Sequence, residues 1–223
     1  MSALIGFFGE QITMFLMWLF ISRKEYQRFH NVIVPAEDGT TQIDHLLISR
    51  YGIFVVETKN MKGWIFGSEN QATWTQSLYK RRHTFQNPLR QNYRHVMCLA
   101  EYLKLDPSVF HSIVFFIGEC TFKTPMPPNV MRDGLSSYIR SFKDPILTDD
   151  EVVMVVNQIK VLKSDPSLNH RTHMQSLAVR HDQSNVCPKC GSTLVTRTVK
   201  RGDRAGSEFF GCSTFPKCRY VKK

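Results

Sequence analysis

An acidic and a basic side chain stand two residues apart at the end of a strongly apolar stretch. The run GIFVVETK is apolar from Ile53 to Val56 and then presents Glu57 and Lys59. Residues two apart on a β-strand point to the same face, so these two side chains lie side by side. A carboxylate beside an ammonium group can help to bind a divalent cation and to activate water against a phosphodiester. The alternative is an ordinary surface salt bridge at a strand end.

A second carboxylate, Asp44, comes from the preceding predicted strand, TTQIDHLLIS. A turn at RYG joins the two strands as a hairpin. A two-residue loop at Tyr51 and Gly52 places Asp44 opposite Lys59. Any loop with an even number of residues keeps Asp44 on the face of Glu57 and Lys59, within reach of both. Two converging carboxylates form a hard oxygen site that suits Mg²⁺ or Mn²⁺.

Both strands of this hairpin are apolar on both faces, which indicates a sheet covered by helices on each side. Strict alternation puts Leu46, Ile48, Ile53 and Val55 on one face and Ile43, Leu47, Phe54 and Val56 on the other. We also expect strands at 28–35, 64–66, 74–79 and 109–118, a helix from Pro88 to about residue 105, and a helix opened by a Thr148 and Glu151 capping box. This order predicts a mixed α/β domain.

The N-terminal segment ALIGFFGEQITMFLMWLFI is apolar enough to raise the question of a membrane helix. It lacks the basic start and small-residue cleavage site of a signal peptide. Glu10 lies in its middle, and a carboxylate at bilayer depth is costly. We therefore expect a buried first helix, with membrane contact as the alternative.

Four of the six cysteines fall in the last 37 residues, as Cys-x2-Cys followed by Cys-x5-Cys. This spacing predicts a closed tetrahedral Zn²⁺ site in a reducing, cytoplasmic compartment. Its ligands are Cys187, Cys190, Cys212 and Cys218. The same segment carries nine Lys and Arg against two acidic residues, whereas residues 1–186 carry 20 against 17. A compact cationic module of this kind most often binds nucleic acid or an anionic membrane.

Motifs in order along the first half of the chain resemble the nuclease-related domain (NERD) family of the PD-(D/E)xK restriction-like nucleases. The resemblance covers residues 6 to about 120 and is carried by Gly9-Glu10, Thr41 to His45, Gly52 to Lys59, Gly63-Trp64-Ile65, Trp74 and Asn87 to Asn92. It implies a restriction-endonuclease-like mixed central sheet flanked by helices. We therefore predict a NERD domain over 1–163, a linker over 164–186 and a zinc ribbon over 187–223.

The resemblance also implies roles for single residues. Asp44 matches the family's metal-binding aspartate, Glu57 the acidic residue of its (D/E)xK pair, and Lys59 the lysine of that pair. Glu10 matches a helix carboxylate that joins the metal site in many members. Gln91 matches a polar position that holds water or phosphate near the site. These matches imply a magnesium-dependent nuclease.

The cysteine module resembles the C4 zinc ribbons of bacterial type IA topoisomerases through CPKCG, FGCS and PKC. Those ribbons bind DNA, largely single-stranded. Predicted phosphate contacts are Arg197, Lys200, Arg201, Arg204, Lys217, Arg219, Lys222 and Lys223, and predicted stacking residues are Phe209, Phe210, Phe215 and Tyr220. The alternative for the aromatic side chains is a small core of the ribbon itself, which we expect for one of the two adjacent phenylalanines.

Three weaker patterns complete the interpretation. A basic run, KRRH at 80–83, fits either a nucleic-acid groove or an ordinary charged loop. Trp64 and Trp74 are expected in the core, and a histidine set at 170, 173 and 181 is expected to be solvated. No Gly-x4-Gly-Lys-Ser/Thr motif occurs, so no ATP site is expected.

Two hypotheses follow: a metal-dependent DNA nuclease, or a non-catalytic DNA-binding adaptor on a nuclease scaffold.

Overall fold

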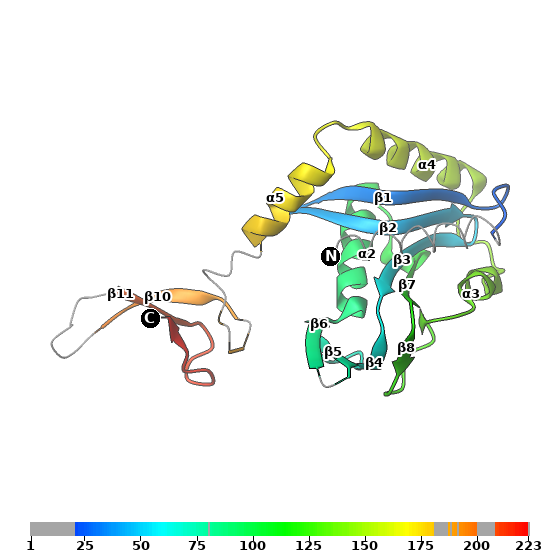
Figure 1. Cartoon of the computed structure of the whole chain (residues 1–223). Helices are drawn as coiled ribbons and strands as arrows, with labels where there is room; N and C mark the ends of the chain where they lie inside the picture. Colours follow the sequence, from blue (N-terminus) through cyan, green and yellow to red (C-terminus); the bar gives the residue numbers. More distant parts are fainter. Residues whose placement is uncertain are drawn as a thin grey trace. The chain divides into compact units, whose positions relative to one another are not determined.

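A mixed five-stranded sheet forms the centre of the larger part of the chain (Figure 1). The computed structural model describes residues 21–79, 81–180, 187, 189–190, 192–199 and 208–222. The strands are β1 (Gln27–Ala36), β2 (Gly39–Ser49), β3 (Gly52–Asn60), β7 (Phe110–Ile117) and β9 (Val130–Met131). Their order in the sheet is β1-β2-β3-β7-β9, with antiparallel pairing up to β3 and parallel pairing beyond it.

Helices cover both faces of this sheet. Helices α2 (Pro88–Leu103) and α4 (Asp149–Ser164) bury one apolar cluster with β1, β2 and β3, and α3 (Leu135–Ser141) buries a second cluster on the opposite face. A short 3-10 turn, Pro107–Val109, leads into β7. Thr148 and Glu151 form the predicted capping box at the start of α4. The prediction of a mixed sheet flanked by helices is therefore confirmed.

The loop between β2 and β3 holds two residues, an even number, as expected. It lies one position earlier than predicted. Ser49 pairs with Gly52, so the loop consists of Arg50 and Tyr51. Gly52 has φ +118°, and a Cβ there would lie 2.7 Å from Nε2 of His111. Only glycine fits this first position of β3, which sets the register of the hairpin.

This register shifts the expected pairing of the charged residues by two positions. His45 pairs with Val56, so the next position along sets Asp44 opposite Glu57. The predicted pairing of Asp44 with Lys59 is therefore wrong. The shift is even, so a regular strand would keep Asp44 on the side of Glu57 and Lys59, with Glu57 in place of Lys59 as its opposite residue.

Strict alternation along β2 fails at Asp44. Along the ladder between β1 and β2, each residue pairs with a residue of the other strand, except Asn31 and Asp44. Asn31 has φ +51°. A residue in this left-handed region interrupts the pleat, as in a β-bulge. Ile43 consequently joins Leu46 in the cluster under α2 and α4, so its predicted place on the far face is wrong.

A second, four-stranded sheet follows the carboxyl end of β3. Its strands are β4 (Gly63–Phe66), β5 (Thr73–Leu78), β6 (Arg81–Gln86) and β8 (Cys120–Phe122), in the order β6-β5-β4-β8. Arg81, Arg82 and His83 of the basic run, which was expected in a groove or a loop, form the first half of β6. Trp74 is fully buried, as expected, whereas Trp64 is 53% exposed, because alternation along β4 turns Ile65 rather than Trp64 toward the core. The prediction that Trp64 is a core residue is wrong.

Helix α5 (His170–Arg180) lies within the segment interpreted as a linker. Its sequence, HRTHMQSLAVR, has no continuous apolar stripe, which is why periodicity did not predict it. His173 is buried, with Nδ1 2.9 Å from Oγ1 of Thr40, whereas His170 is exposed and His181 lies outside the described residues. The histidine set is therefore not gathered at one point among the residues described.

The chain divides into two compact units after His173, and each is described by itself. The smaller unit contains strands β10 (Leu194–Thr198), β11 (Glu208–Cys212) and β12 (Val221–Lys222) in one antiparallel sheet. The predicted boundaries at 163 and 186 stay predictions. Within the described part of the chain, we find no helix long and apolar enough to cross a membrane. The apolar N-terminal segment with Glu10 lies outside it.

Candidate active site and metal centre

Three predicted site residues meet at the junction of β3 and α2. Nζ of Lys59 lies 2.7 Å from Oε1 of Glu57 and donates a hydrogen bond of 2.8 Å to Oε1 of Gln91. Lys59 and Glu57 come from alternate positions of β3, and Gln91 lies in the first turn of α2. The helix begins there because Oδ1 of Asn87 accepts the amide of Leu89 and proline follows at the first helical position.

His95, which the sequence analysis did not single out, completes this cluster. It lies one helical turn after Gln91, and its Nε2 is 3.1 Å from Oε2 of Glu57. Its Nδ1 lies 2.7 Å from Oγ1 of Thr41. Because a carboxylate only accepts hydrogen bonds, Nε2 of His95 is the donor to Glu57. In the sequence, His95 stands four residues after Gln91, which places both side chains on the same face of a helix. Only the packing of α2 against β2 and β3 shows that His95 reaches Glu57 and Thr41.

The electrostatic state of Glu57 follows from its neighbours. Its side chain is 3% exposed, and burial by itself would raise the pKa of the carboxyl. The charge of Lys59 and the hydrogen bond from His95 outweigh burial and hold the pKa of Glu57 below its ordinary value. Glu57 is thus an ionised, buried carboxylate. The alternative for this hairpin was an ordinary surface salt bridge. Glu57 is buried too deeply to belong to a surface salt bridge.

Asp44 approaches β3 where the ladder with β2 ends. The last pair of the ladder is His45 with Val56. Beyond it, Oδ2 of Asp44 accepts the backbone amide of Thr58 at 2.8 Å, in place of a strand carbonyl. Thr58 lies between the two charged residues of β3 in the chain, so this hydrogen bond fixes the Asp44 carboxylate to the segment that carries them. Glu10, the remaining predicted acidic residue of the site, lies outside the described residues.

Asn92 fixes α2 against the strands that carry the site. Its buried Nδ2 lies 2.9 Å from O of Val55, 2.9 Å from Oγ of Ser112 and 3.0 Å from O of Ile113. One amide therefore bridges β3 and β7 and sets the rotation of the helix. Because Gln91 is the neighbouring residue and His95 lies three residues on, the same bridge determines how Gln91 meets Lys59 and how His95 meets Glu57.

A pair of histidines, His45 buried and His30 partly buried, lies beside the site on β1 and β2. Nδ1 of His30 is 2.7 Å from Nδ1 of His45. Burial lowers the pKa of His45 to about 3 and that of His30 to about 4. Both rings are therefore neutral at physiological pH, and one donates its ring proton to the other.

The two carboxylates suit a hard divalent cation. Mg²⁺ is commonly held by one or two carboxylates and keeps several water molecules. Among the residues described, neither Asp44 nor Glu57 belongs to a tight group of three or more possible metal ligands. The ionised state of Glu57 and the acceptor role of Asp44 are what such a cation requires. Asp44 and Glu57 thus offer carboxylate oxygens as metal ligands, and Lys59 offers an ammonium group next to Glu57.

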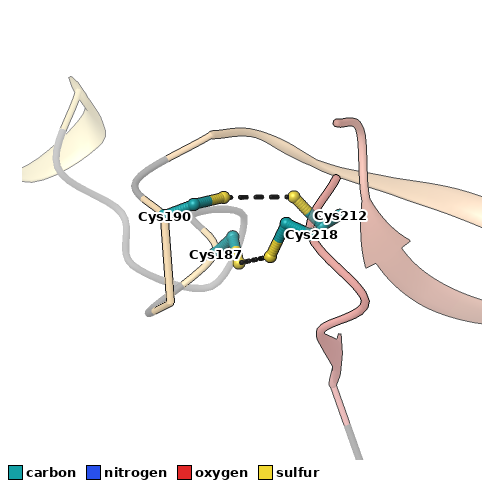
Figure 2. Close-up of side chains that lie close together, drawn as sticks. All are labelled: Cys187, Cys190, Cys212 and Cys218. Atoms are coloured by element: carbon teal, nitrogen blue, oxygen red, sulfur yellow. Dashed lines mark hydrogen bonds between the residues drawn. The ribbon is translucent and has the colours of Figure 1, made fainter. Parts of the chain in front are cut away.

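The four predicted cysteines of the smaller unit gather at one point (Figure 2). Their sulfur atoms all lie within 4.8 Å of one another, with Cys187 to Cys218 at 3.7 Å and Cys190 to Cys212 at 3.3 Å. Zn–S bonds of about 2.3 Å in a tetrahedron place sulfur atoms roughly 3.8 Å apart. The separations fit that geometry and are far longer than a disulfide. The cluster therefore fits Zn²⁺.

The thiols of this cluster differ in their pKa. Hydrogen bonds from Ser192 lower the pKa of Cys190 to about 5. A backbone hydrogen bond with Tyr220 lowers the pKa of Cys218, but burial and the sulfur atoms around it outweigh that effect and raise it to about 12. Crowded thiols cannot all ionise without a compensating cation, which a bound Zn²⁺ supplies.

A groove of about 490 Å³ lies on the ribbon surface. Five residues predicted to contact nucleic acid line it, namely Arg197, Phe209, Phe215, Arg219 and Tyr220. The Arg197 guanidinium lies 5.5 Å from the centre of the Phe215 ring. Phe210 is 41% exposed and Phe209 is half-buried, while Lys217 is exposed. Lys200, Arg201 and Arg204 lie outside the described residues.

Fold and site together define the class of this chain as an α/β nuclease-like domain joined to a C4 zinc ribbon. Residues 5–117 match the nuclease-related domain family. This match covers half of the chain, and the chain belongs to that family. Residues 184–223 match the topoisomerase DNA-binding C4 zinc finger.

Similar proteins agree with this division. An uncharacterized protein of Bacillus anthracis is 40% identical over 142 residues, covering 61% of this chain and 66% of that protein. DNA topoisomerase 1 of Mycoplasma genitalium is 56% identical over 58 residues, and that of Methanocaldococcus jannaschii 54% over 64 residues. These matches cover 26% and 29% of this chain but only 8% of each topoisomerase. No solved structure matches the chain.

Proposed function

We propose that this protein is a magnesium-dependent nuclease that hydrolyses DNA phosphodiester bonds. The observation that carries the proposal is the contact of Lys59 with Glu57 and Gln91, next to the Asp44 carboxylate. A buried, ionised carboxylate is costly unless its interactions compensate for burial. Its place in a nuclease-related domain supports a catalytic use for it.

Each residue has a distinct part in this proposal. Asp44 and Glu57 would hold the cation, with Glu10 as a further candidate ligand. When bound, Mg²⁺ stabilises the negative charge that develops on a phosphodiester. The Lys59 ammonium group would orient the attacking water and stabilise the negative charge that develops on the phosphodiester, and the side-chain oxygen of Gln91 holds that ammonium group in place.

The zinc ribbon would tether the nuclease domain to DNA. Tethering raises the effective concentration of the catalytic domain at the phosphodiester without any new catalytic contact. The match to a topoisomerase DNA-binding zinc finger and the cationic, aromatic groove support this role.

The test is cleavage of linear, circular and single-stranded DNA by purified protein with Mg²⁺ or Mn²⁺, in parallel with two variants. Asp44→Asn keeps an oxygen for the Thr58 amide but removes the charge, and Lys59→Ala removes the ammonium group. Each variant should lose at least about 100-fold in cleavage rate, the usual effect of removing such a group. DNA binding should stay near the parent level, because the ribbon is unchanged.

Asp38→Asn is the matched control. Asp38 is an exposed carboxylate in the turn between β1 and β2, paired with Arg94, and its substitution should leave cleavage unchanged. Asp44→Ala, which also removes the hydrogen bond to Thr58, should be no more active than Asp44→Asn. If Asp44→Asn and Lys59→Ala cut DNA as well as the parent does, the assignment fails.

A second candidate function is a non-catalytic DNA-binding adaptor. One observation favours it: both oxygens of Glu57 already have partners in the protein, Lys59 and His95. Such a closed network is stable without a cation. The adaptor would bind DNA with the same affinity in Mg²⁺, Mn²⁺ and their absence and would never cleave it.

A further inference from the structure

Trp64 on β4 exposes a large aromatic side chain that is not part of the core. Its side chain is 53% exposed, although both of its neighbours across the sheet are small hydroxyl residues, Ser77 and Thr121. Nζ of Lys123 lies 4.5 Å from the centre of its ring. An exposed tryptophan ring beside a lysine offers a surface on which another planar group can stack.

The residues around Trp64 are set by the register of the second sheet. Thr121, Trp64, Ser77 and Arg82 form one row across β8, β4, β5 and β6. Adjacent strands lie about 4.8 Å apart, so the row spans roughly 14 Å. The other face of the sheet carries Ile65, Trp74 and Phe85, which pack into the core. Trp64 and Arg82 therefore lie on the outward face, together with exposed hydroxyl groups.

The charged side chains that the strands contribute to this outward face are all basic. The sequences of β4, β5, β6 and β8 contain no aspartate or glutamate. Lys123 and Arg82 are exposed on the same side as Trp64. A groove of about 460 Å³ adjoins Trp64; its described lining includes Lys62 and the 96% exposed Tyr79, against one carboxylate, Glu119.

The sheet is continuous with the elements that carry the active-site residues. Gly63 follows the end of β3 by three positions, and its amide donates to O of Glu119 at 2.9 Å. At the other end, β6 leads through Asn87 into α2, and Nδ2 of Asn87 donates to O of Gln71 at 2.7 Å. The chain thus passes from Lys59 through this sheet to Gln91.

We propose that the outward face of the β6-β5-β4-β8 sheet binds a single-stranded segment of DNA, with one base stacked on Trp64 and phosphates at Lys123 and Arg82. The bases of an intact duplex are already stacked, so an exposed ring selects an unpaired base. Exposed lysine and arginine complement the phosphates. The proposal rests on the proposed function for its choice of DNA as partner, and it adds a substrate-binding surface on the nuclease domain itself.

The test uses the full-length Asp44→Asn variant without divalent cations, so that binding is measured apart from cleavage. An oligothymidylate carrying 5-iodouracil is irradiated in the complex, and the crosslinked residue is mapped by mass spectrometry. We expect crosslinks at Trp64 and quenching of tryptophan fluorescence that Trp64→Phe removes. Because the ribbon also binds DNA, this local readout is needed beside total affinity.

Two matched substitutions separate stacking from simple burial. Trp64→Phe keeps an aromatic face, whereas Trp64→Leu keeps only an apolar side chain. Affinity for the single strand should fall at least about fivefold in Trp64→Leu, the lower end for loss of one stacked base, and less in Trp64→Phe. Lys123→Gln should weaken binding and its dependence on salt. Melting temperatures should match the parent, because Trp64 is exposed.

The proposal is overturned if crosslinks map only to ribbon residues such as Phe215, or if Trp64→Leu binds as the parent does. A blue shift of Trp64 fluorescence with protein concentration, in the absence of DNA, would also overturn it, because the face would then be a contact between copies of the chain. If the parent protein crosslinks at Trp64 but never cleaves DNA, the result would contradict the proposed nuclease activity and support the proposed DNA-binding surface.

Discussion

His95 links helix α2 to the acidic residue of the candidate site. Its imidazole bridges Oγ1 of Thr41 and Oε2 of Glu57, from two different strands. A ring held at both nitrogens has one orientation and one tautomer, and it thereby fixes the plane of the carboxylate. We infer that His95 is a positioning residue, because it acts on the site through Glu57.

Substitutions at His95 should separate its two contacts. His95→Gln keeps an amide donor near the position of Nε2, so Glu57 keeps its partner. His95→Asn keeps a shorter amide that reaches Thr41 but leaves Oε2 of Glu57 without that donor. We expect cleavage to fall about 10- to 100-fold in His95→Asn and much less in His95→Gln.

The measurement is the cleavage rate as a function of Mn²⁺ concentration. The half-saturating concentration should rise in His95→Asn and return toward the parent value in His95→Gln, a split that a general loss of packing would not produce. Thermal unfolding provides the control for folding. Equal activity and equal metal dependence in the two variants would show that the donor to Glu57 is not required.

At the scale of elements, the site depends on how α2 meets β3 and β7. The helix brings Gln91 and His95 to the pair on β3, and Asn92 is the buried polar contact that sets its rotation. A helix buried only through apolar contacts could slide or rotate at small cost. Directed hydrogen bonds to two strands make one rotation preferred.

Loss of the Asn92 amide should therefore reduce both stability and activity. Asn92→Leu has a similar size but removes hydrogen bonds to Val55, Ser112 and Ile113, and we expect it to cost about 2 kcal/mol in free energy of unfolding. Asn92→Asp should cost more, because a carboxylate would face two carbonyl oxygens. Urea unfolding measures both variants.

Tyr93→Ala on the same helix is the matched control. Tyr93 is 64% exposed, so its substitution should change stability by less than about 0.5 kcal/mol. If Asn92→Leu were as stable and as active as the parent, the rotation of α2 would be set by its apolar contacts alone.

At the scale of the whole molecule, the two units hold their structure by different means. The larger unit has extended apolar clusters on both faces of its sheet. The described core of the smaller unit consists of three cysteines and Leu194, with Tyr220 packed against it. So small an apolar core cannot offset the conformational entropy of folding, and a structural metal is the usual remedy.

Removal of the zinc site should consequently affect one unit and spare the other. Cys212→Ser should reduce bound zinc from about one ion per chain to near zero, measured by mass spectrometry of the metal. DNA affinity should fall at least about tenfold, while the main thermal transition of the larger unit stays in place. In cleavage assays KM should rise with little change in kcat, because the tether is lost and not the active site.

A variant is preferable here to a chelator, which would remove Mg²⁺ as well as Zn²⁺. Cys98→Ser, a substitution of a cysteine outside the cluster, is the control and should retain zinc. A proportional fall of kcat in Cys212→Ser would contradict independent units.

The local spacing of the residues determined several features of this protein. The cysteine pairs predicted the metal cluster, because both pairs stand on short connections that allow few arrangements. The capping box predicted the start of α4, and the loop between β2 and β3 holds an even number of residues, as expected. The capping box and the hairpin loop involve residues close together in the chain, and so does each of the two cysteine pairs taken by itself.

Only the tertiary structure decided the partners of Glu57 and the environment of Trp64. His95 lies 38 positions from Glu57, and its role depends on the rotation of α2. The exact register of the hairpin depends on the close approach of His111 to Gly52. Trp64 is exposed because Ile65 takes the inward position of β4. Contacts between distant segments are set by packing, which no spacing along the chain encodes.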